Sequence, residues 1–236
     1  QHADKILTDS NSTKHDIIKY YGVSEDKIVT IYLGVEERFK KIRDLSALEQ
    51  LRAKYRITSP NVILYVGSIH TRRNIEQLLR AFSMLCQKMP DIQLVIVGKR
   101  EYPYLDIQAL IDELALPQRV ILPGYVQDVD LPLLYNAASL FVYPSSYEGF
   151  GLPPLEAMTC GTPVLTSDNS SLPEVTAGRA NLGAPRCDAS RRAHPHANAG
   201  PQAIRRKPRR INQPERTGEP FFNAELAEVA EGAPPA

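Results

Sequence analysis

Two glutamates, Glu148 and Glu156, stand eight positions apart in the segment YPSSYEGFGLPPLEAMTCGTPVLTS at residues 143–167, on either side of a Gly-Phe-Gly turn. An ionised carboxylate only accepts hydrogen bonds, so sugar hydroxyls are natural partners for it. A nucleotide sugar carries hydroxyls on both sides of its diphosphate. The pattern therefore predicts that one glutamate binds a ribose and the other a transferred hexose.

The turn between the two glutamates can bring backbone amides to an anion. Gly149 and Gly151 allow the backbone to come close to a ligand. Pro153 and Pro154 are typical of a first helical turn, so a helix should begin near Leu152. Unpaired N–H groups at a helix start can hold a phosphate or a developing negative charge without a metal ion. The amides expected to do so are those of Phe150, Gly151 and Leu152.

A cationic stretch, YVGSIHTRRNIEQ, precedes another expected helix. It places Arg72 and Arg73 directly before Asn74, an expected N-cap with Gln77 at capping-box spacing. Cations beside a helix start favour an anion site. The alternative interpretation is a pair of solvated loop arginines.

The elements that must position these residues follow an alternating pattern. Apolar strands are expected at 62–67 and 92–98 and in RVILPG, SLFVYP and TPVLTS, with helices in NIEQLLRAFSMLCQKM and near 104–115 and 129–137. This pattern predicts an α/β fold, a Rossmann-like parallel sheet with helices on both faces. Ligands in such sheets bind at the carboxyl ends of the strands. The loops expected to line one crevice follow Gly67, Gly98, Gly124 and Pro144. Lys99 and Arg100 lie in the second of these loops, where ordinary loop charge is the competing interpretation.

Several motifs closely resemble, in order, those of retaining GT-B glycosyltransferases of the glycogen-synthase-like family, family 4 type (glycosyl transferases group 1). They are GV at 34–35, LYVGS, LVIVG, VILPGYV, FVYPSSYEGFG and a final LPEV. The resemblance implies the C-terminal, donor-binding lobe of that fold. The segment ADKILTDSNSTKHDIIKYYGV resembles the last strand and helix of the N-terminal lobe, which carries the acceptor site in that family.

The resemblance also implies roles for individual residues. Glu148 approaches the donor sugar, Glu156 binds the ribose hydroxyls, and Arg73 stabilises the leaving diphosphate where the family usually has a lysine. Ser68 stands where many members have an arginine, so one of two usual phosphate cations is missing or replaced. The catalytic candidates are thus Glu148 and Arg73. The donor-binding candidates are Ser68, Arg72, Arg73, Lys99, Tyr125, Glu148, Gly149, Phe150, Gly151, Leu152 and Glu156.

The composition excludes several other classes of protein. Twenty-eight Lys and Arg against 27 Asp and Glu give a net charge of +1, so the whole chain has no general attraction to nucleic acid or anionic lipid. Cys86, Cys160 and Cys187 stand far apart without a CxxC pair, which favours buried thiols in a reducing compartment over a zinc site or a disulfide framework. No apolar run approaches the roughly 18 residues of a membrane span. We therefore expect no metal ion or other cofactor, no specific nucleic acid, no transmembrane segment and a cytoplasmic location, with peripheral attachment to the inner membrane face left open.

The expected organisation has three parts. Residues 1–40 end the N-terminal lobe and form its linker, 41–177 form the nucleotide-sugar-binding lobe, and 178–236 form a tail. Between residues 179 and 216, ten basic residues face two acidic ones, five prolines interrupt the chain, and large apolar residues are sparse. This composition predicts disorder. A shifted reading frame or a fused segment is the preferred interpretation of the tail, and a nucleic-acid-binding tail is the alternative.

Three functions remain open at this stage. The first is an enzyme that transfers a hexose from a nucleoside diphosphate sugar to a saccharide or lipid-linked acceptor with retention, of the mannosyltransferase type found in polysaccharide biosynthesis. The second is a module that binds nucleotide sugar without turnover and relies on a separately encoded N-terminal lobe. The third is the product of a truncated or frameshifted gene. The donor base, the sugar and the acceptor are left open.

Overall fold

A computed structural model describes residues 3–99, 106–178 and 180–183 of this chain. Its helices and strands are, in order, β1 (Ile6–Thr8), α1 (Asn11–Tyr21), η1 (Glu25–Lys27), β2 (Ile28–Thr30), α2 (Leu45–Lys54), β3 (Asn61–Val66), η2 (Thr71–Arg73), α3 (Ile75–Lys88), β4 (Ile92–Val97), α4 (Ile107–Glu113), β5 (Val120–Gly124), α5 (Leu131–Ala137), β6 (Leu140–Tyr143), α6 (Leu152–Cys160), β7 (Val164–Ser167), α7 (Leu172–Val175) and β8 (Asn181–Gly183). Among the described residues, no helix is long and apolar enough to cross a membrane.

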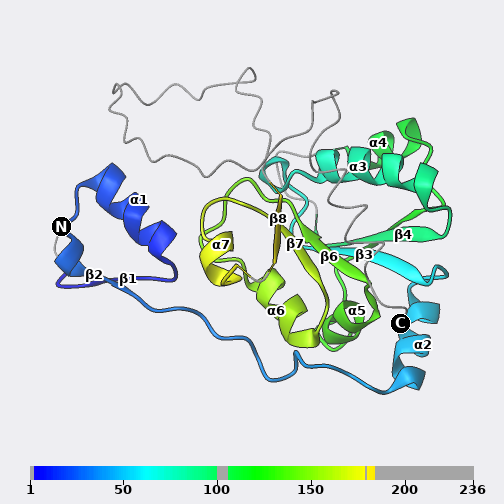
Figure 1. Ribbon diagram of the computed structural model, residues 1–236, viewed down its shortest axis with the longest axis horizontal. Helices are drawn as coiled ribbons and strands as arrows, with labels where there is room; N and C mark the ends of the chain where they lie inside the picture. The colour runs from blue at the N-terminus through cyan, green and yellow to red at the C-terminus, as the bar shows by residue number, and fades with distance from the viewer. Residues whose placement is uncertain (1–2, 100–105, 179, 184–236) are drawn as a thin grey trace, which may run out of the picture.

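Within the described residues, six strands form one parallel sheet in the order β5-β4-β3-β6-β7-β8 (Figure 1). Strands β4 and β5 follow β3 in order toward one edge of the sheet. Strand β6 lies on the other side of β3, and β7 and β8 follow it toward the opposite edge. The point where the direction changes lies between β3 and β6. Doubly wound sheets bind ligands at this point, at the carboxyl ends of the strands. The predicted Rossmann-like fold is confirmed.

Helices cover both faces of this sheet, as the continuously apolar strands require. Every residue of β4 is buried, and so are four of the six residues of β3. In Figure 1, α3 and α4 lie on one side of the sheet, and α5 and α6 on the other. The buried stripe of α3 follows helical spacing and consists of Ile75, Leu78, Leu79, Ala81, Phe82 and Leu85. These layers enclose the hydrophobic core and fix the strand ends that carry the polar loops.

Residues 3–30 form a small unit beside the main sheet, at the left of Figure 1. Strands β1 and β2 pair in parallel, and α1 packs against them. Helix α1 has a hydroxyl N-cap, Ser10, and ends before Gly22, which adopts a left-handed φ of 64°. An extended linker then runs to α2 (Figure 1).

The sheet extends beyond the boundary expected from the sequence. Strand β8, Asn181–Gly183, pairs with β7, although the folded lobe was expected to end at residue 177. Pairing at a sheet edge depends on backbone hydrogen bonds, so a strand of three residues needs no apolar run to mark it. Arg100, Cys187 and the basic tail beyond Gly183 lie outside the described residues.

Candidate functional site

Two loops meet at the switch point between β3 and β6. The Ser146 backbone N–H donates to the Arg72 carbonyl at 2.8 Å, and the Asn74 side-chain amide donates to the Pro144 carbonyl at 2.8 Å. Asn74 is the N-cap residue of α3, as expected, but its side chain does not cap the helix. This residue adopts a left-handed φ of 54° and makes no side-chain cap, because its amide bonds across to the β6 loop instead. The crevice predicted from the strand order is therefore closed on one side by direct contacts between the two loops.

Arg73 and Glu148 form a buried ion pair in this crevice. Their side chains are 11% and 8% exposed. The Ser145 hydroxyl donates to Glu148 Oε1 at 2.6 Å, and Arg72 Nη1 lies 3.5 Å from Oε2. Arg72 also donates to the Tyr147 carbonyl at 3.1 Å. Arg73 is thus a buried, paired cation, whereas the alternative interpretation made it a solvated loop charge.

Tyr143, the last residue of β6, holds Arg73 from a second side. The Arg73 guanidinium donates to the Tyr143 hydroxyl and lies 5.3 Å from the centre of its ring. Burial raises the pKa of Tyr143, and the nearby Arg73 lowers it, so the phenol stays neutral and accepts this bond. Arg73 Nε is buried and has no hydrogen-bond partner among the described residues. One donor of the buried guanidinium is therefore left unsatisfied by the described residues.

Helix α6 begins where the sequence predicted, at Leu152, with prolines in its first turn. Gly151 precedes it with φ of 104°, and a Cβ atom there would lie 2.8 Å from Leu172 Cδ2, so only glycine fits without a shift. The Ser171 hydroxyl donates to the Phe150 carbonyl at 2.6 Å and to the Glu148 carbonyl at 3.1 Å. No motif in the sequence pointed to this buried serine, which is the N-cap residue of α7 and holds the glycine turn.

Glu156 lies on the fifth position of α6 and is half-buried. The Tyr135 hydroxyl donates to its Oε2 atom at 2.7 Å. Burial raises the pKa of Glu156, whereas the Tyr135 hydrogen bond and the nearby Arg38 lower it and Glu36 raises it. Tyr135 stands in an expected helix without any motif, so the sequence did not reveal its contact with Glu156.

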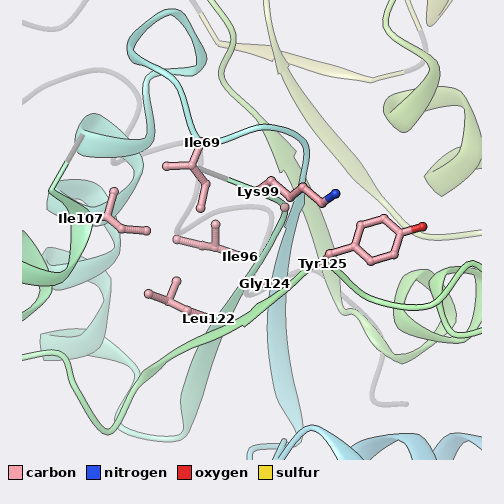
Figure 2. A pocket seen from close by; sticks show the side chains of 8 residues that line it. Ile69, Ile96, Lys99, Ile107, Leu122, Gly124 and Tyr125 are labelled. Carbon is pink, nitrogen blue, oxygen red and sulfur yellow. The ribbon is translucent and has the colours of Figure 1, made fainter. Parts of the chain in front are cut away.

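A cavity of about 340 Å³ lies at the carboxyl ends of β4 and β5 (Figure 2). Figure 2 shows aliphatic side chains on one side of it, with Lys99 and Tyr125 on the other, where Lys99 Nζ lies 5.0 Å from the centre of the Tyr125 ring. The lining residues are Ile69, Ile96, Gly98, Lys99, Ile107, Leu122, Gly124 and Tyr125. Lys99 and Tyr125, both predicted as donor-binding residues, thus line the same cavity. Its apolar wall was not predicted from the sequence.

Ser68 does not supply the cation that the resemblance expects at its position. It is half-buried, and its carbonyl accepts a hydrogen bond from the Tyr65 hydroxyl at 3.0 Å. Gly98 lies against this loop so closely that a Cβ atom there would overlap the Gly67 carbonyl. The loops after β3 and β4 are therefore in direct contact.

The small N-terminal unit contacts the turn between the two glutamates. The Ser10 and Thr13 hydroxyls donate to the Gly149 carbonyl, at 2.5 and 3.2 Å. The Glu174 carboxylate on α7 accepts from the backbone N–H groups of Asn11 and Ser12, at 3.0 and 2.8 Å. The start of α1 is thus capped by α7 and anchored to the glycine turn.

The donor groups of this site are arginines, a lysine, hydroxyls and backbone amides. In the part of the chain that the structure describes, no group of three or more His, Cys, Asp or Glu side chains could hold a metal ion. Cys160 is buried on α6, and burial raises the pKa of its thiol to about 11, so the thiol stays protonated. The arrangement suits an anionic ligand with several hydroxyl groups.

The sequence matches the family model described as Glycosyl transferases group 1 over residues 48–185. It is 38% identical over 174 residues to the O-antigen chain mannosyltransferase B of Escherichia coli, with 73% of this chain and 45% of that protein covered. It is also 38% identical over 180 residues to the serotype-specific mannosyltransferase WbdA of Escherichia coli, with 74% of this chain and 22% of that protein covered. The chain thus spans less than half the length of these curated relatives.

Two solved structures have a similar fold. One is Alr3699/HepE of Anabaena in complex with UDP and glucose, with a TM-score of 0.69, 25% identity, and 78% of this chain and 50% of that chain covered. The other is the sucrose-phosphate synthase of Thermosynechococcus elongatus, with a TM-score of 0.64, 28% identity, and coverage of 78% and 46%.

Proposed function

The chain belongs to the glycosyl transferases group 1 family, and from this premise we propose that it binds the donor in a reaction that transfers a hexose from a nucleoside diphosphate sugar. The acceptor in this proposal is a saccharide or a lipid-linked saccharide, and the anomeric configuration is retained. Mannose is the first sugar to test, because two curated relatives are named mannosyltransferases. One observation carries the proposal: a buried arginine with an unpaired Nε donor is ion-paired to Glu148, the residue directly before the glycine turn that leads into α6.

The diphosphate binds at Arg73 and the start of α6. A buried N–H group without a partner costs free energy, and a phosphate oxygen would satisfy Arg73 Nε. The amides of Phe150, Gly151 and Leu152 add donors and the positive end of the helix dipole. Arg72, half-exposed at 45%, adds a second charge at the mouth. These groups neutralise the diphosphate without a metal ion, so a chelator should leave its binding unchanged.

The nucleoside extends from this point along the carboxyl edge of the sheet. Glu156 accepts hydrogen bonds from the ribose hydroxyls, because an ionised carboxylate can accept two at once. The base enters the cavity beside Lys99 and Tyr125, whose aliphatic wall suits a flat heterocycle. The single Lys99 ammonium and the exposed Tyr125 hydroxyl then offer polar contacts at its mouth.

The hexose lies on the other side of the diphosphate, next to Glu148. This carboxylate accepts from the sugar hydroxyls and thereby orients the anomeric carbon. The acceptor hydroxyl attacks that carbon from the face that the diphosphate leaves, so the configuration is retained. The bond from the anomeric carbon to the phosphate oxygen breaks, and the acceptor's proton passes to that oxygen. Arg73 and the α6 amides stabilise the charge that develops there.

The acceptor must be held by another part of the enzyme. The face of the β1-β2 unit includes Leu7 and Val29, which lie opposite each other and are 66% and 41% exposed. Ile31 and Leu33 continue this apolar row at 54% and 45% exposure. We propose that the acceptor-binding part of the enzyme packs on this face, whichever chain carries it.

Calorimetry with GDP-mannose, UDP-glucose and ADP-glucose tests donor binding. We expect one of them to bind, with affinity unchanged by EDTA and strongly reduced by Arg73→Met. Arg80→Met is the matched control, because Arg80 makes an exposed pair with Glu76 on α3, away from the site. Failure of all three donors to bind would overturn the proposal.

A second assay separates transfer from binding alone. Labelled donor and a panel of mannosylated acceptors are incubated with the chain, alone and with the acceptor-binding part of a relative, and NMR identifies the anomer of the product. Retention in the product supports the proposed reaction. Donor binding without product under both conditions would favour a nucleotide-sugar-binding module.

A further inference from the structure

We propose that Tyr135, on α5, is a positioning residue that holds the Glu156 carboxylate in the orientation in which it accepts hydrogen bonds from a ribose. This inference rests on the proposed function, because it deepens the account of the ribose contact. It assigns a role to a residue that lies outside the glycine turn, the cationic loop and the cavity.

The contact between the two side chains is direct. The Tyr135 hydroxyl donates to Glu156 Oε2 at 2.7 Å, and α5 packs against α6. No other hydrogen-bond donor to this carboxylate is found among the residues that the structure describes, so Oε1 remains open to a ligand. One oxygen is thus fixed by the protein while the other can face an incoming hydroxyl.

Tyr135 itself is held firmly. Its side chain is fully buried. Its ring meets Phe39 at 5.9 Å and Phe141 at 5.4 Å between ring centres, both in edge-on geometry, and the Thr162 hydroxyl donates to its carbonyl at 2.6 Å. Because these contacts restrict the Tyr135 side chain, its hydroxyl holds the Glu156 carboxylate in one orientation. The conformational entropy that Glu156 loses when a ligand binds is then smaller.

The hydroxyl also acts on the charge of Glu156. Burial is the largest influence and raises the pKa of this carboxyl, and the hydrogen bond from Tyr135 opposes it. Arg38 on the linker also lowers the pKa, and Glu36 raises it. The other titratable groups coupled to this carboxylate are Tyr143 on β6 and Cys160 on α6, and both have raised pKa values and so stay neutral. Removing the Tyr135 hydroxyl should therefore favour the protonated, poorer acceptor.

The test is Tyr135→Phe, which keeps the ring and its two aromatic contacts. Calorimetry measures the affinity for GDP, UDP and ADP, and for their 2′,3′-dideoxy forms, from about pH 5.5 to about pH 8. The tightest-binding ribonucleotide should bind about fivefold more weakly to the variant, the scale of one lost hydrogen bond. The matched dideoxynucleotide should bind equally well to both proteins, which also shows that the site is folded. The loss should grow as the pH falls, because the carboxyl of the variant takes up its proton at a higher pH.

Tyr55→Phe is the matched control. It removes a tyrosine hydroxyl that donates to another carboxylate, Asp130, at 2.6 Å, outside the proposed site. This control should not change nucleotide affinity. In Glu156→Gln, the ratio of ribonucleotide affinity to dideoxynucleotide affinity should be independent of pH in this range, because both ligands share the titration of the terminal phosphate. Adding Tyr135→Phe to Glu156→Gln should cause no loss that grows toward low pH.

The outcomes separate the two claims. If the native chain prefers the ribonucleotide and Tyr135→Phe matches it at every pH, the positioning role is wrong and the proposed function stands. If Tyr135→Phe weakens ribo- and dideoxynucleotides alike, Tyr135 serves the structure of the site only, and the inference is overturned. If the native chain binds none of the three diphosphates, both claims are overturned.

Discussion

Replacing Arg73 with methionine should destabilise the folded chain strongly, even in the absence of any ligand. Glu148 is 8% exposed, and Arg73 is its most buried cationic partner. Methionine has a similar length but no charge, so the change leaves the carboxylate in a crevice that excludes most water. Breaking one side of a buried ion pair typically costs about 3 to 5 kcal/mol.

Two contacts that remain place the expected loss at the lower end of this range. The Ser145 hydroxyl still donates to Glu148, and Arg72 still lies 3.5 Å away, although it is 45% exposed and partly screened by solvent. We therefore expect a loss of about 3 kcal/mol in the free energy of unfolding. The exposed Arg80–Glu76 pair on α3 provides the comparison, because Arg80→Met should cost only about 0.3 to 0.5 kcal/mol.

Urea unfolding followed by circular dichroism measures both variants, and a double-mutant cycle with Glu148→Gln isolates the pair. Because the neutral amide has no charge to compensate, Arg73→Met together with Glu148→Gln should be more stable than Arg73→Met alone. A loss for Arg73→Met no greater than that for Arg80→Met, or a double variant that is the least stable of the set, would show that the buried pair does not stabilise the fold in this way.

Three further predictions concern the glycine turn, the ribose carboxylate and the N-terminal unit. Gly151→Ala should lower the melting temperature and weaken nucleotide binding, because its φ is 104° and the new Cβ meets Leu172; Gly34→Ala, where the space is open, is the control and should do neither. The raised pKa of Glu156 means that the folded chain binds this proton more tightly than the unfolded chain does, so its contribution to stability is complete below the ordinary value of 4.5 and is lost as the pH rises through the raised pKa. Glu156→Gln should therefore melt at a higher temperature than the native chain at about pH 8 and lose this advantage in acid, and equal melting at about pH 8 would contradict the assigned burial. Glu174→Gln should weaken the cap on α1, which limited proteolysis would detect as faster cleavage within residues 5–21; an unchanged cleavage rate would show that the other contacts of α1 suffice.

The fold followed from the sequence because its signals are strong and local. Apolar strands and amphipathic helices alternate, and this pattern is typical of a parallel sheet between two helical layers. The start of α6 was also predictable, since two prolines and a preceding glycine leave few other conformations. The short strand β8 was missed, because the strand of three residues carries no such pattern.

The contacts within the site were less predictable, because they depend on which side chains meet across the sheet. From the sequence, we expected Arg73 and Glu148 to act as separate ligands of a nucleotide sugar in the same crevice. In the structure, the two side chains form an ion pair with each other. Asn74 is the N-cap residue that the spacing predicted, yet its side chain bonds to the neighbouring loop and does not cap the helix. Tyr135 carried no signal at all, because no motif shows which partner the hydroxyl of a buried tyrosine finds.

The Arg73–Glu148 pair also explains how a carboxylate can stand beside the proposed phosphate site. With 11% exposure, Arg73 would be an uncompensated buried cation if no anion were present. Glu148 supplies that anion, and Tyr143 holds the guanidinium in place without adding charge. A diphosphate that reaches Arg73 Nε would supply the negative charge instead, which would free Glu148 to accept from sugar hydroxyls. In this account the glutamate does not repel the donor, because the same arginine that binds the phosphate keeps the carboxylate neutralised until the donor arrives.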